Sequence, residues 1–152
     1  MSVKIIDNTI HSVKGIVYRK INNSIKYLVT YETDTGMVSF PGGAQDITDE
    51  SLEATMKREL LEELGLTTDA YALHLTDLTH EFVHTDEKNK ERYGKKGIQH
   101  VFLVKYTGGE EIKISEDIGS VKFYSKDQVL RELKNAYEYW TPLFQKASKL
   151  VE

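Results

Sequence analysis

The segment RELLEELGL, residues 58–66, constrains the fold more than any other part of the chain. It closes a run in which apolar residues recur every four positions, namely Leu52, Met56, Leu60 and Leu64. This spacing predicts a helix over residues 50–64 with one apolar stripe. Its start has three candidate caps, Thr48, Asp49 and Ser51. Gly65 suits the left-handed position that ends a helix.

The predicted helix also carries three neighbouring carboxylates, Glu59, Glu62 and Glu63. At about 100° per residue they lie beside the apolar stripe rather than opposite it, at the margin of the core. Like charges this close destabilise a helix, and a cation between them would reverse that effect. A solvated charged face is the common alternative, but oxygen-only carboxylate clusters suit hard cations such as Mg²⁺. Arg58 stands four residues before Glu62, where it can orient a carboxylate or form a surface ion pair.

Most of the remaining chain reads as strands separated by turns. Strands are predicted at residues 11–19, 25–31, 37–40, 98–106 and 119–125. Residues 71–84 fit one long strand or two short ones, and the polar residues 85–97 fit an exposed loop. The sequence PGG at 41–43 is predicted to be loop.

The C-terminal part returns to a helical pattern. Ser125 and Gln128 have the spacing of a capping box, and Pro142 marks a break or the first turn of a second helix. Helices must cover the apolar faces of a sheet, so the pattern predicts a mixed α/β domain.

Composition excludes several classes of protein. The 152 residues fit one domain, residues 1–152, and the net charge of −4 argues against nucleic-acid binding through a basic surface. Without cysteine, disulfides and cysteine-based sites are ruled out. The N-terminal residues contain no long apolar run, which predicts no membrane association and a cytoplasmic protein. The oligomeric state stays open, a homodimer included.

The stretch GGAQDITDESLEATMKRELLEELGL, residues 42–66, resembles the signature of the Nudix hydrolases. That signature is a glycine, five residues, a glutamate, seven residues and then Arg-Glu-aliphatic-x-Glu-Glu-x-Gly-aliphatic. Glu50 and Arg58 have the required separation, and every fixed position from Arg58 to Leu66 matches. Strict spacing places the first glycine at Ala44, whereas Gly43 lies one residue upstream, so the loop looks one residue longer.

The resemblance implies a fold, a set of ligands and a reaction. The fold is an α/β/α sandwich with a mixed sheet. Glu59, Glu62 and Glu63 would bind Mg²⁺ or Mn²⁺, and the carbonyl of Gly42 is a candidate additional ligand. Arg58 would complete the catalytic set by orienting a glutamate. The Nudix loop would be supported by Gly43, Glu50 and Gly65. The general base or an extra ligand would be a helix glutamate or one of Glu116 and Asp117, two acids that equally fit an exposed turn.

The implied reaction is metal-dependent hydrolysis of a diphosphate bond in a nucleotide, releasing a monophosphate product. We expect a nucleoside triphosphate or a related nucleoside diphosphate-linked compound as the small-molecule substrate. A dinucleoside polyphosphate such as diadenosine tetraphosphate is one alternative, and a non-catalytic nucleotide-binding module is another. Removal of an mRNA cap or of a 5′ diphosphate from RNA is disfavoured by the acidic balance.

Further substrate contacts are predicted in the loop 85–97. Arg92 and Lys95 could meet phosphates and Tyr93 could stack on a base, although a solvated hairpin loop fits the same residues. The segment YEYWTPLF, residues 137–144, favours packing on the sheet, with Trp140 a candidate for a base pocket. His80, His84 and His100 lie in or beside strands and fit surface or core positions equally well.

Overall fold

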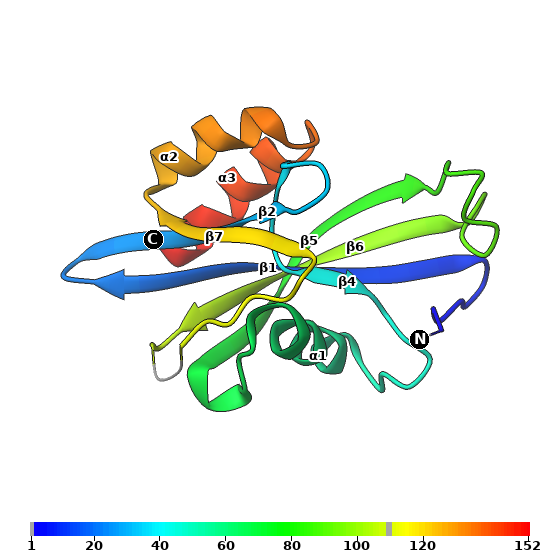
Figure 1. Ribbon diagram of the computed structural model, residues 1–152, viewed down its shortest axis with the longest axis horizontal. Helices are drawn as coiled ribbons and strands as arrows, with labels where there is room; N and C mark the ends of the chain where they lie inside the picture. Colours follow the sequence, from blue (N-terminus) through cyan, green and yellow to red (C-terminus); the bar gives the residue numbers. More distant parts are fainter. Residues whose placement is uncertain (1, 109–110) are drawn as a thin grey trace.

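A computed structural model describes residues 2–108 and 111–152. Their strands form one twisted sheet with α1 on one face and α2 and α3 on the other (Figure 1). The predicted α/β/α sandwich is therefore confirmed. The N-terminus lies on the same side of the sheet as α1, close to the loop that precedes this helix (Figure 1).

The sheet of the described residues has seven strands in the order β3-β2-β1-β6-β5, with β4 paired to β1 and β7 paired to β2. The pair β1–β6 is parallel and the other pairs are antiparallel, so the predicted mixed sheet is confirmed. The bounds are β1 Thr9–Ile21, β2 Ser24–Glu32, β3 Val38–Ser39, β4 Gly42–Ala44, β5 Tyr71–Val83, β6 Lys96–Tyr106 and β7 Ile118–Tyr124.

Two expectations about the strands are now settled. The segment predicted as one or two strands is the single strand β5, with an irregularity between Leu75 and Thr79. The prediction of loop for PGG is wrong for its glycines, because Gly42 and Gly43 belong to β4 and pair with Lys14 and Val13. Two glycines give no strand signal by themselves, and this pairing depends on a partner far away in sequence.

The helices begin and end largely as the local signals predict. Helix α1, Leu52–Leu64, is capped by Ser51 and ends at Gly65, which has a left-handed φ of 68°. Helix α2, Lys126–Glu132, starts with the Ser125–Gln128 capping box. Pro142 lies in the first turn of α3, Trp140–Val151, and short 3₁₀ turns occupy Thr68–Ala70 and Leu133–Asn135. None of the helices in the described ranges is long and apolar enough to cross a membrane.

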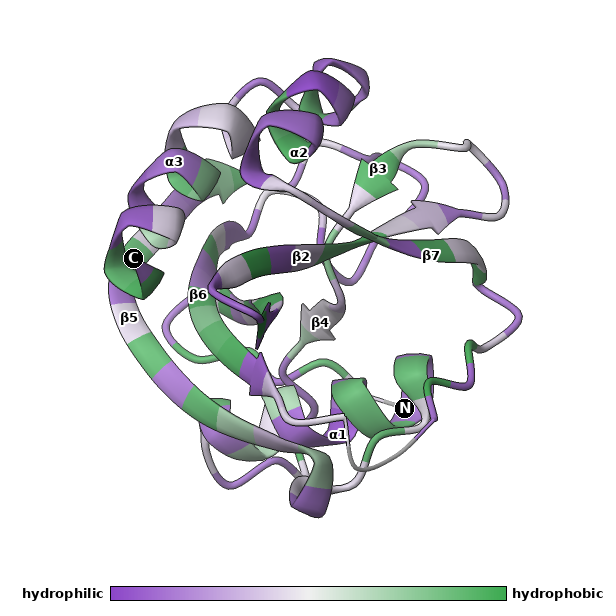
Figure 2. Cartoon of the chain, turned by 90° about the vertical axis from the view of Figure 1, so that its left-hand side faces the viewer, coloured by the Kyte–Doolittle hydropathy of each residue, from purple (hydrophilic) through white to green (hydrophobic). Residues whose placement is uncertain are grey.

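The core consists of two layers separated by the sheet. In β6, Val101 and Leu103 face the layer under α2 and α3, whereas Phe102 and Val104 face the layer over α1. This alternation explains the continuous apolar run of β6, which is buried on both faces. Figure 2 shows these hydrophobic residues along the strand.

A fork in the sheet sets up the site. Strands β1 and β2 pair only from Tyr18 to Ile21 of β1, and then they diverge. The segment 38–44 crosses between the two arms, because β3 pairs with β2 and β4 pairs with β1. The Gly15 amide donates to the carbonyl of Pro41 (2.8 Å), which holds the crossing segment against β1. The crossing places β4 directly beside α1 (Figure 1).

Neighbouring leucines on α1 give a matched stability test. Leu60 is 0% exposed and Leu61 is 53% exposed. We expect Leu60→Ala to lower the free energy of unfolding by about 2–5 kcal/mol, because it leaves a cavity between α1 and the sheet. Leu61→Ala should change it by roughly 0.5 kcal/mol or less. Urea denaturation measures both, and equal losses would contradict the packing described for α1.

Candidate active site

One guanidinium joins the loop before α1 to the glutamates of this helix. Arg58 Nη2 donates to Asp49 Oδ2 (2.9 Å) and to the carbonyl of Ala44 (3.1 Å), and Nε donates to Asp49 Oδ1 (3.1 Å). Its Nη1 donates to Glu59 Oε1 (2.9 Å) and Glu62 Oε2 (3.2 Å). The predicted pairing of Arg58 with a signature glutamate is present. The two-pronged bond to Asp49 was not predicted.

Asp49 has the loop-supporting role that was predicted for Glu50. It is buried, and it accepts from the Asp46 amide (2.9 Å) and the Thr55 hydroxyl (3.0 Å) as well as from Arg58. Its hydrogen bonds with Arg58 are the main reason why the pKa of Asp49 is lowered. The prediction for Glu50 is therefore corrected, because that side chain is exposed.

The correction also changes how the loop is aligned with the signature. Gly43 and Asp49 are separated by five residues, as the signature requires between its glycine and its acidic residue. The additional residue then falls between Asp49 and Arg58, which is the capping turn that starts α1, and not in the loop after Gly43.

Glu59 and Glu63 lie together at the end of β4. Glu59 is only 7% exposed, and its carboxylate packs over Gly43. The amide of Gly42 donates to Glu63 Oε1 (2.8 Å). Burial, followed by the nearby Glu59, raises the pKa of Glu63 to about 7 against the opposing effects of the Gly42 amide and Lys14. Glu62 lies further out, with a side chain 49% exposed.

The two glycines let β4 come this close to its neighbours. A Cβ atom on Gly42 would lie 1.9 Å from the carbonyl oxygen of Val13, and one on Gly43 would lie 2.6 Å from Glu59 Oε1. The first contact is with backbone and cannot be relieved by a side-chain rotation. Gly42 and Gly43 thus allow β4 to pack closely against Val13 and Glu59.

The donor set is suited to a hard divalent cation. It consists of carboxylate oxygens from Glu59, Glu62 and Glu63, and a buried carboxyl with a raised pKa favours a proton or a cation beside it. Within the described ranges, no three Asp, Glu or His side chains are already arranged around a common point as metal ligands. The Nη1 of Arg58 holds both Glu59 and Glu62.

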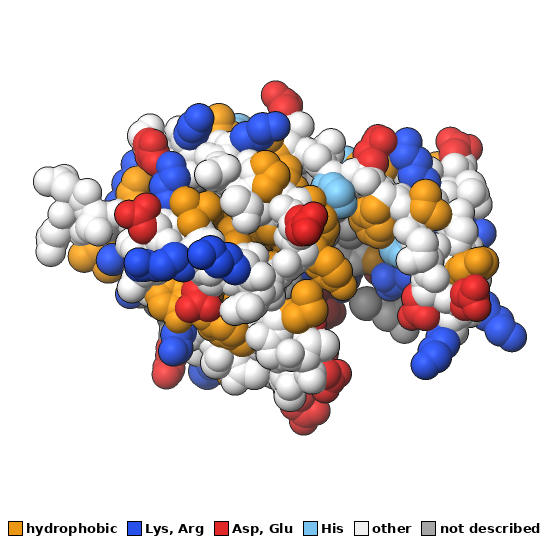
Figure 3. All heavy atoms as spheres, turned by 90° about the horizontal axis from the view of Figure 1, so that it is seen from above, with side chains coloured by type: hydrophobic (Ala, Val, Ile, Leu, Met, Phe, Trp, Pro, Cys, Tyr) orange, Lys and Arg blue, Asp and Glu red, His pale blue; other side chains and the backbone are white. Residues whose placement is uncertain are grey.

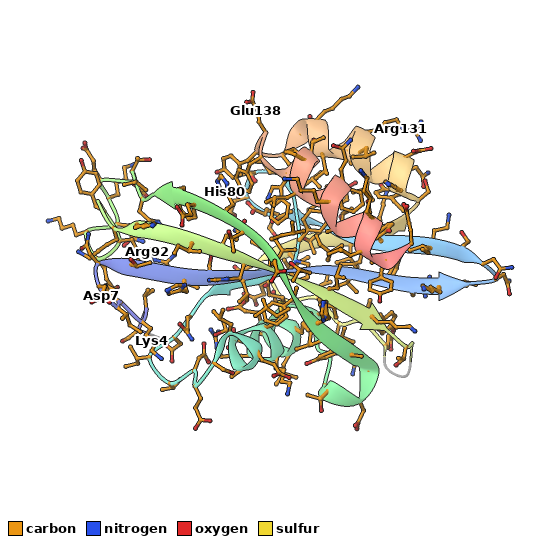
Figure 4. The ribbon with its side chains drawn as sticks, turned by 180° about the vertical axis from the view of Figure 1, so that it is seen from behind. Lys4, Asp7, His80, Arg92, Arg131 and Glu138 are labelled. Carbon is orange, nitrogen blue, oxygen red and sulfur yellow. The ribbon has the colours of Figure 1, made fainter. Side chains whose placement is uncertain are left out.

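An open cavity of about 280 Å³ adjoins Glu59. Its walls come from the N-terminal segment, β4 and the loop after it, α1, and the loop between β5 and β6, and they include Glu59, Gly43 and Arg92. Figure 4 shows Arg92 at the same end of the molecule as Lys4. The structure therefore brings the predicted Arg92 to the site. Lys95 lies in the same loop, and Tyr93 is 49% exposed; neither lines this cavity.

The predicted acids Glu116 and Asp117 lie in an exposed turn before β7. This segment is anchored to the C-terminal end of α1, because the amide of Ser115 donates to the carbonyl of Glu63 (3.0 Å). The backbone carbonyl of Glu116 also accepts from the Thr33 hydroxyl (2.8 Å). The turn is thus held beside the glutamate helix, while both carboxylates remain in solvent.

A second, aromatic cavity of about 430 Å³ lies on the other face of the sheet. The rings of His80 and Tyr139 stack at 3.7 Å, and Phe82, His84 and Tyr137 complete its aromatic lining. Figure 3 shows histidine side chains in the recess between the helix-covered sheet and the β5–β6 tip. Burial lowers the pKa of His80 and of His84, which favours their neutral forms.

Sequence reasoning did not find this aromatic cavity. The alternating positions 80 and 82 in β5, continued by 84 directly after the strand, were its one available signal, since alternate residues share a face. Trp140, the predicted candidate, instead packs in the core against Phe40 (ring centroids 4.7 Å apart). Lys14 was also missed. Its Nζ donates to the carbonyl of Phe40 (3.0 Å) at the fork.

A mixed sheet between helices, with a glycine-lined carboxylate cluster in the C-terminal half of one helix, defines a Nudix-type hydrolase site. The NUDIX domain model matches residues 16–144. The chain belongs to the Nudix hydrolase family, a family of pyrophosphohydrolases. No curated protein matches the sequence.

Three solved structures illustrate the similarity of fold. The Ap4A hydrolase of C. elegans, as a binary complex, is 19% identical with a TM-score of 0.74, covering 93% of this chain and 97% of that one. The NUDIX domain of Shewanella oneidensis NrtR, complexed with ADP ribose, is 17% identical with a TM-score of 0.68, covering 95% and 89%. The E. coli dihydroneopterin triphosphate pyrophosphohydrolase is 14% identical with a TM-score of 0.70, covering 90% and 92%.

The neighbouring acids Asp49 and Glu50 give a direct test of the corrected assignment. At pH 7, Asp49→Asn should lower the free energy of unfolding by roughly 1.5–3 kcal/mol, the range for hydrogen bonds to charged groups. Glu50→Gln should be nearly neutral, because its side chain is exposed. Chemical denaturation of both variants checks this, and a larger loss for Glu50→Gln would restore the original assignment.

The same experiment has an expected pH dependence. The lowered pKa of Asp49 contributes stability that is complete above the unfolded-state value of about 3.9 and is lost as pH falls through the folded-state value. The stability difference between the wild-type protein and Asp49→Asn should therefore shrink as the pH is lowered below about 3.9. A difference that stays constant there would argue against an ionised Asp49 as the partner of Arg58.

Glu63 should show the opposite dependence in metal-free protein. Folded Glu63 keeps its proton up to about pH 7, whereas an unfolded glutamate releases it near pH 4.3. This carboxyl therefore makes stability fall as pH rises between these values. Denaturation in a chelator should show a smaller fall for Glu63→Gln than for the exposed control Glu53→Gln. Equal slopes would mean that Glu63 is not buried as described.

Proposed function

We propose that the protein hydrolyses a diphosphate bond in a nucleotide, releasing a monophosphate product, with Mg²⁺ or Mn²⁺ as cofactor. The substrate is a nucleoside triphosphate or a related nucleoside diphosphate-linked compound. The observation that carries this proposal is the pair Glu59 and Glu63, a buried carboxylate that lines an open cavity and a half-buried one whose pKa burial raises to about 7. Buried charges of one sign are costly without a cation.

In this proposal the chain's own residues have separate roles. Glu59, Glu62 and Glu63, together with the carbonyl of Gly42, hold the metal. Arg58 fixes Glu59 and Glu62 from one side, and the Gly42 amide orients Glu63 from the other. A divalent cation bound there would screen the phosphate charge and lower the pKa of the attacking water.

The general base and the phosphate contacts come from the surrounding loops. We propose Glu116 or Asp117 as the general base or an extra ligand, since their turn is anchored to α1 at Glu63. We propose that Arg92 contacts a substrate phosphate, because it lines the same cavity as Glu59. Tyr93 and Lys95 are proposed substrate contacts in the same loop.

The aromatic cavity supports a nucleotide rather than a simple polyphosphate. Its volume of about 430 Å³ lies in the range of small-molecule sites, and the flat rings of His80, Phe82 and Tyr139 suit stacking with a base. We propose that the base enters this cavity and that residues 1–152 act as one Nudix domain.

The similarity to an Ap4A hydrolase supports a second candidate, a dinucleoside polyphosphate substrate. The alignment of the two structures covers 97% of the Ap4A hydrolase chain. An ADP-ribose complex on a similar fold supports nucleotide-like ligands in general. Nucleoside triphosphates, dinucleoside polyphosphates and nucleotide sugars together make a panel that separates these candidates.

The decisive assay incubates purified protein with Mg²⁺ and this panel, and then measures phosphate after adding pyrophosphatase. We expect metal-dependent cleavage of one class, with products identified by chromatography. Glu62→Gln should lower the rate by orders of magnitude without unfolding the protein, because it removes a metal ligand. Glu53→Gln on the same helix is the control, since Glu53 only forms a surface pair with Lys57 (3.2 Å).

Two outcomes would count against the proposal. A folded Glu62→Gln protein with full activity would contradict the metal assignment. Nucleotide binding without cleavage of any compound in the panel would favour a non-catalytic binding module.

A further inference from the structure

Lys14 lies at the fork between β1 and β2, beside the segment 38–44 that crosses it. Strand β1 pairs with β4 at Ser12–Lys14 and with β2 only from Tyr18 onward. Between these stretches β1 borders the crossing segment instead of a regular strand. The carboxylate of Glu63 reaches this break from the α1 side, where it accepts from the Gly42 amide (2.8 Å).

The ammonium of Lys14 is held in this break by two neutral acceptors. Nζ donates to the carbonyl of Phe40 (3.0 Å) and to the hydroxyl of Ser39 (3.3 Å). A lysine ammonium has three N–H donors, so these contacts leave one for another acceptor. Burial lowers the pKa of Lys14, and the nearby Glu63, Glu32 and Glu59 oppose this effect. No ion pair within 4 Å joins Lys14 to a carboxylate in the described ranges.

Lys14 also shares a sheet face with the aromatic cavity. In β1, Ser12 and Lys14 pair with Gln99 and Val101 of β6, and His80 of β5 pairs with Gln99. These positions lie on the face covered by α2 and α3, opposite α1. With strands about 4.8 Å apart, Lys14 and His80 are separated by on the order of 10 Å across the sheet.

Lys14 thus lies on the sheet face of the aromatic cavity, and Glu63 on the other face is close enough to act on its charge. We propose that Lys14 is a phosphate-binding residue, whose ammonium contacts a nonbridging oxygen of the substrate's diphosphate between the two cavities. This inference rests on the proposed function. Its basis is the placement of an incompletely paired cation between an aromatic cavity and a carboxylate cluster.

A purely structural role for Lys14 makes a different prediction. If the side chain only ties β1 to the crossing segment, its loss should loosen β4 and weaken metal and phosphate binding together. If the ammonium binds phosphate, its loss should weaken phosphate binding alone. Removing a positive charge near Glu59 and Glu63 should leave Mn²⁺ affinity unchanged or increase it.

The test uses Lys14→Met, with Ser39→Ala as the matched control that removes one tie and keeps the charge. Calorimetry measures Mn²⁺ binding to the full chain, and then binding of methylenediphosphonate, a non-hydrolysable diphosphate, to the Mn²⁺-loaded protein. We expect Lys14→Met to weaken methylenediphosphonate binding about ten- to hundredfold, the usual effect of losing a hydrogen bond to a charged group. Ser39→Ala should change it by less than about threefold.

Unchanged methylenediphosphonate affinity in Lys14→Met would overturn the proposal, as would a parallel loss of Mn²⁺ affinity. If Lys14→Met fails to fold, Lys14→Gln gives the same comparison with a polar side chain that can still bond to Phe40. The measurement needs no turnover, so absence of hydrolysis by the wild-type protein would refute the proposed reaction without deciding the role of Lys14. Where turnover is found, Lys14→Met should raise KM more than it lowers kcat.

Discussion

The guanidinium of Arg58 is the contact on which the site depends. It ties Asp49 and the carbonyl of Ala44 to Glu59 and Glu62, so that a loop and a helix are fixed by one side chain. Arginine suits this role because its planar fork can bind a carboxylate with two donors and still reach other acceptors. Without this positive charge, the acidic side chains around it would repel one another.

The fork in the sheet is the second constraint. The divergence of the two strands leaves a place for the segment 38–44, whose glycines allow it to pack against Val13 and Glu59. The cost of such close packing is that no side chain is tolerated at Gly42.

Local signals were sufficient to predict the glutamate helix and its ends. The apolar repeat, the Ser51 cap and the left-handed Gly65 all depend on neighbours within a few residues. The Ser125–Gln128 capping box and the buried run of β6 were predictable for the same reason. The family resemblance then supplied the ligand set, which remains a prediction for each individual residue.

Features that depend on distant contacts could not be read from the sequence. Asp49 and Glu50 are adjacent acids, and only the folded loop determines which one faces Arg58. Strand β4 is recognisable only from its pairing with β1. The aromatic cavity combines alternate residues of β5 with the segment before α3, and Lys14 gains its position from the divergence of two strands.

Binding of Mn²⁺ to metal-free protein tests the central claim most directly, since it requires no knowledge of the substrate. The account predicts saturable binding that is lost when Glu59 and Glu63 are both replaced by glutamine and is retained in Glu53→Gln. Unchanged Mn²⁺ affinity in a folded Glu59→Gln, Glu63→Gln protein would contradict the assignment of these carboxylates as the metal site.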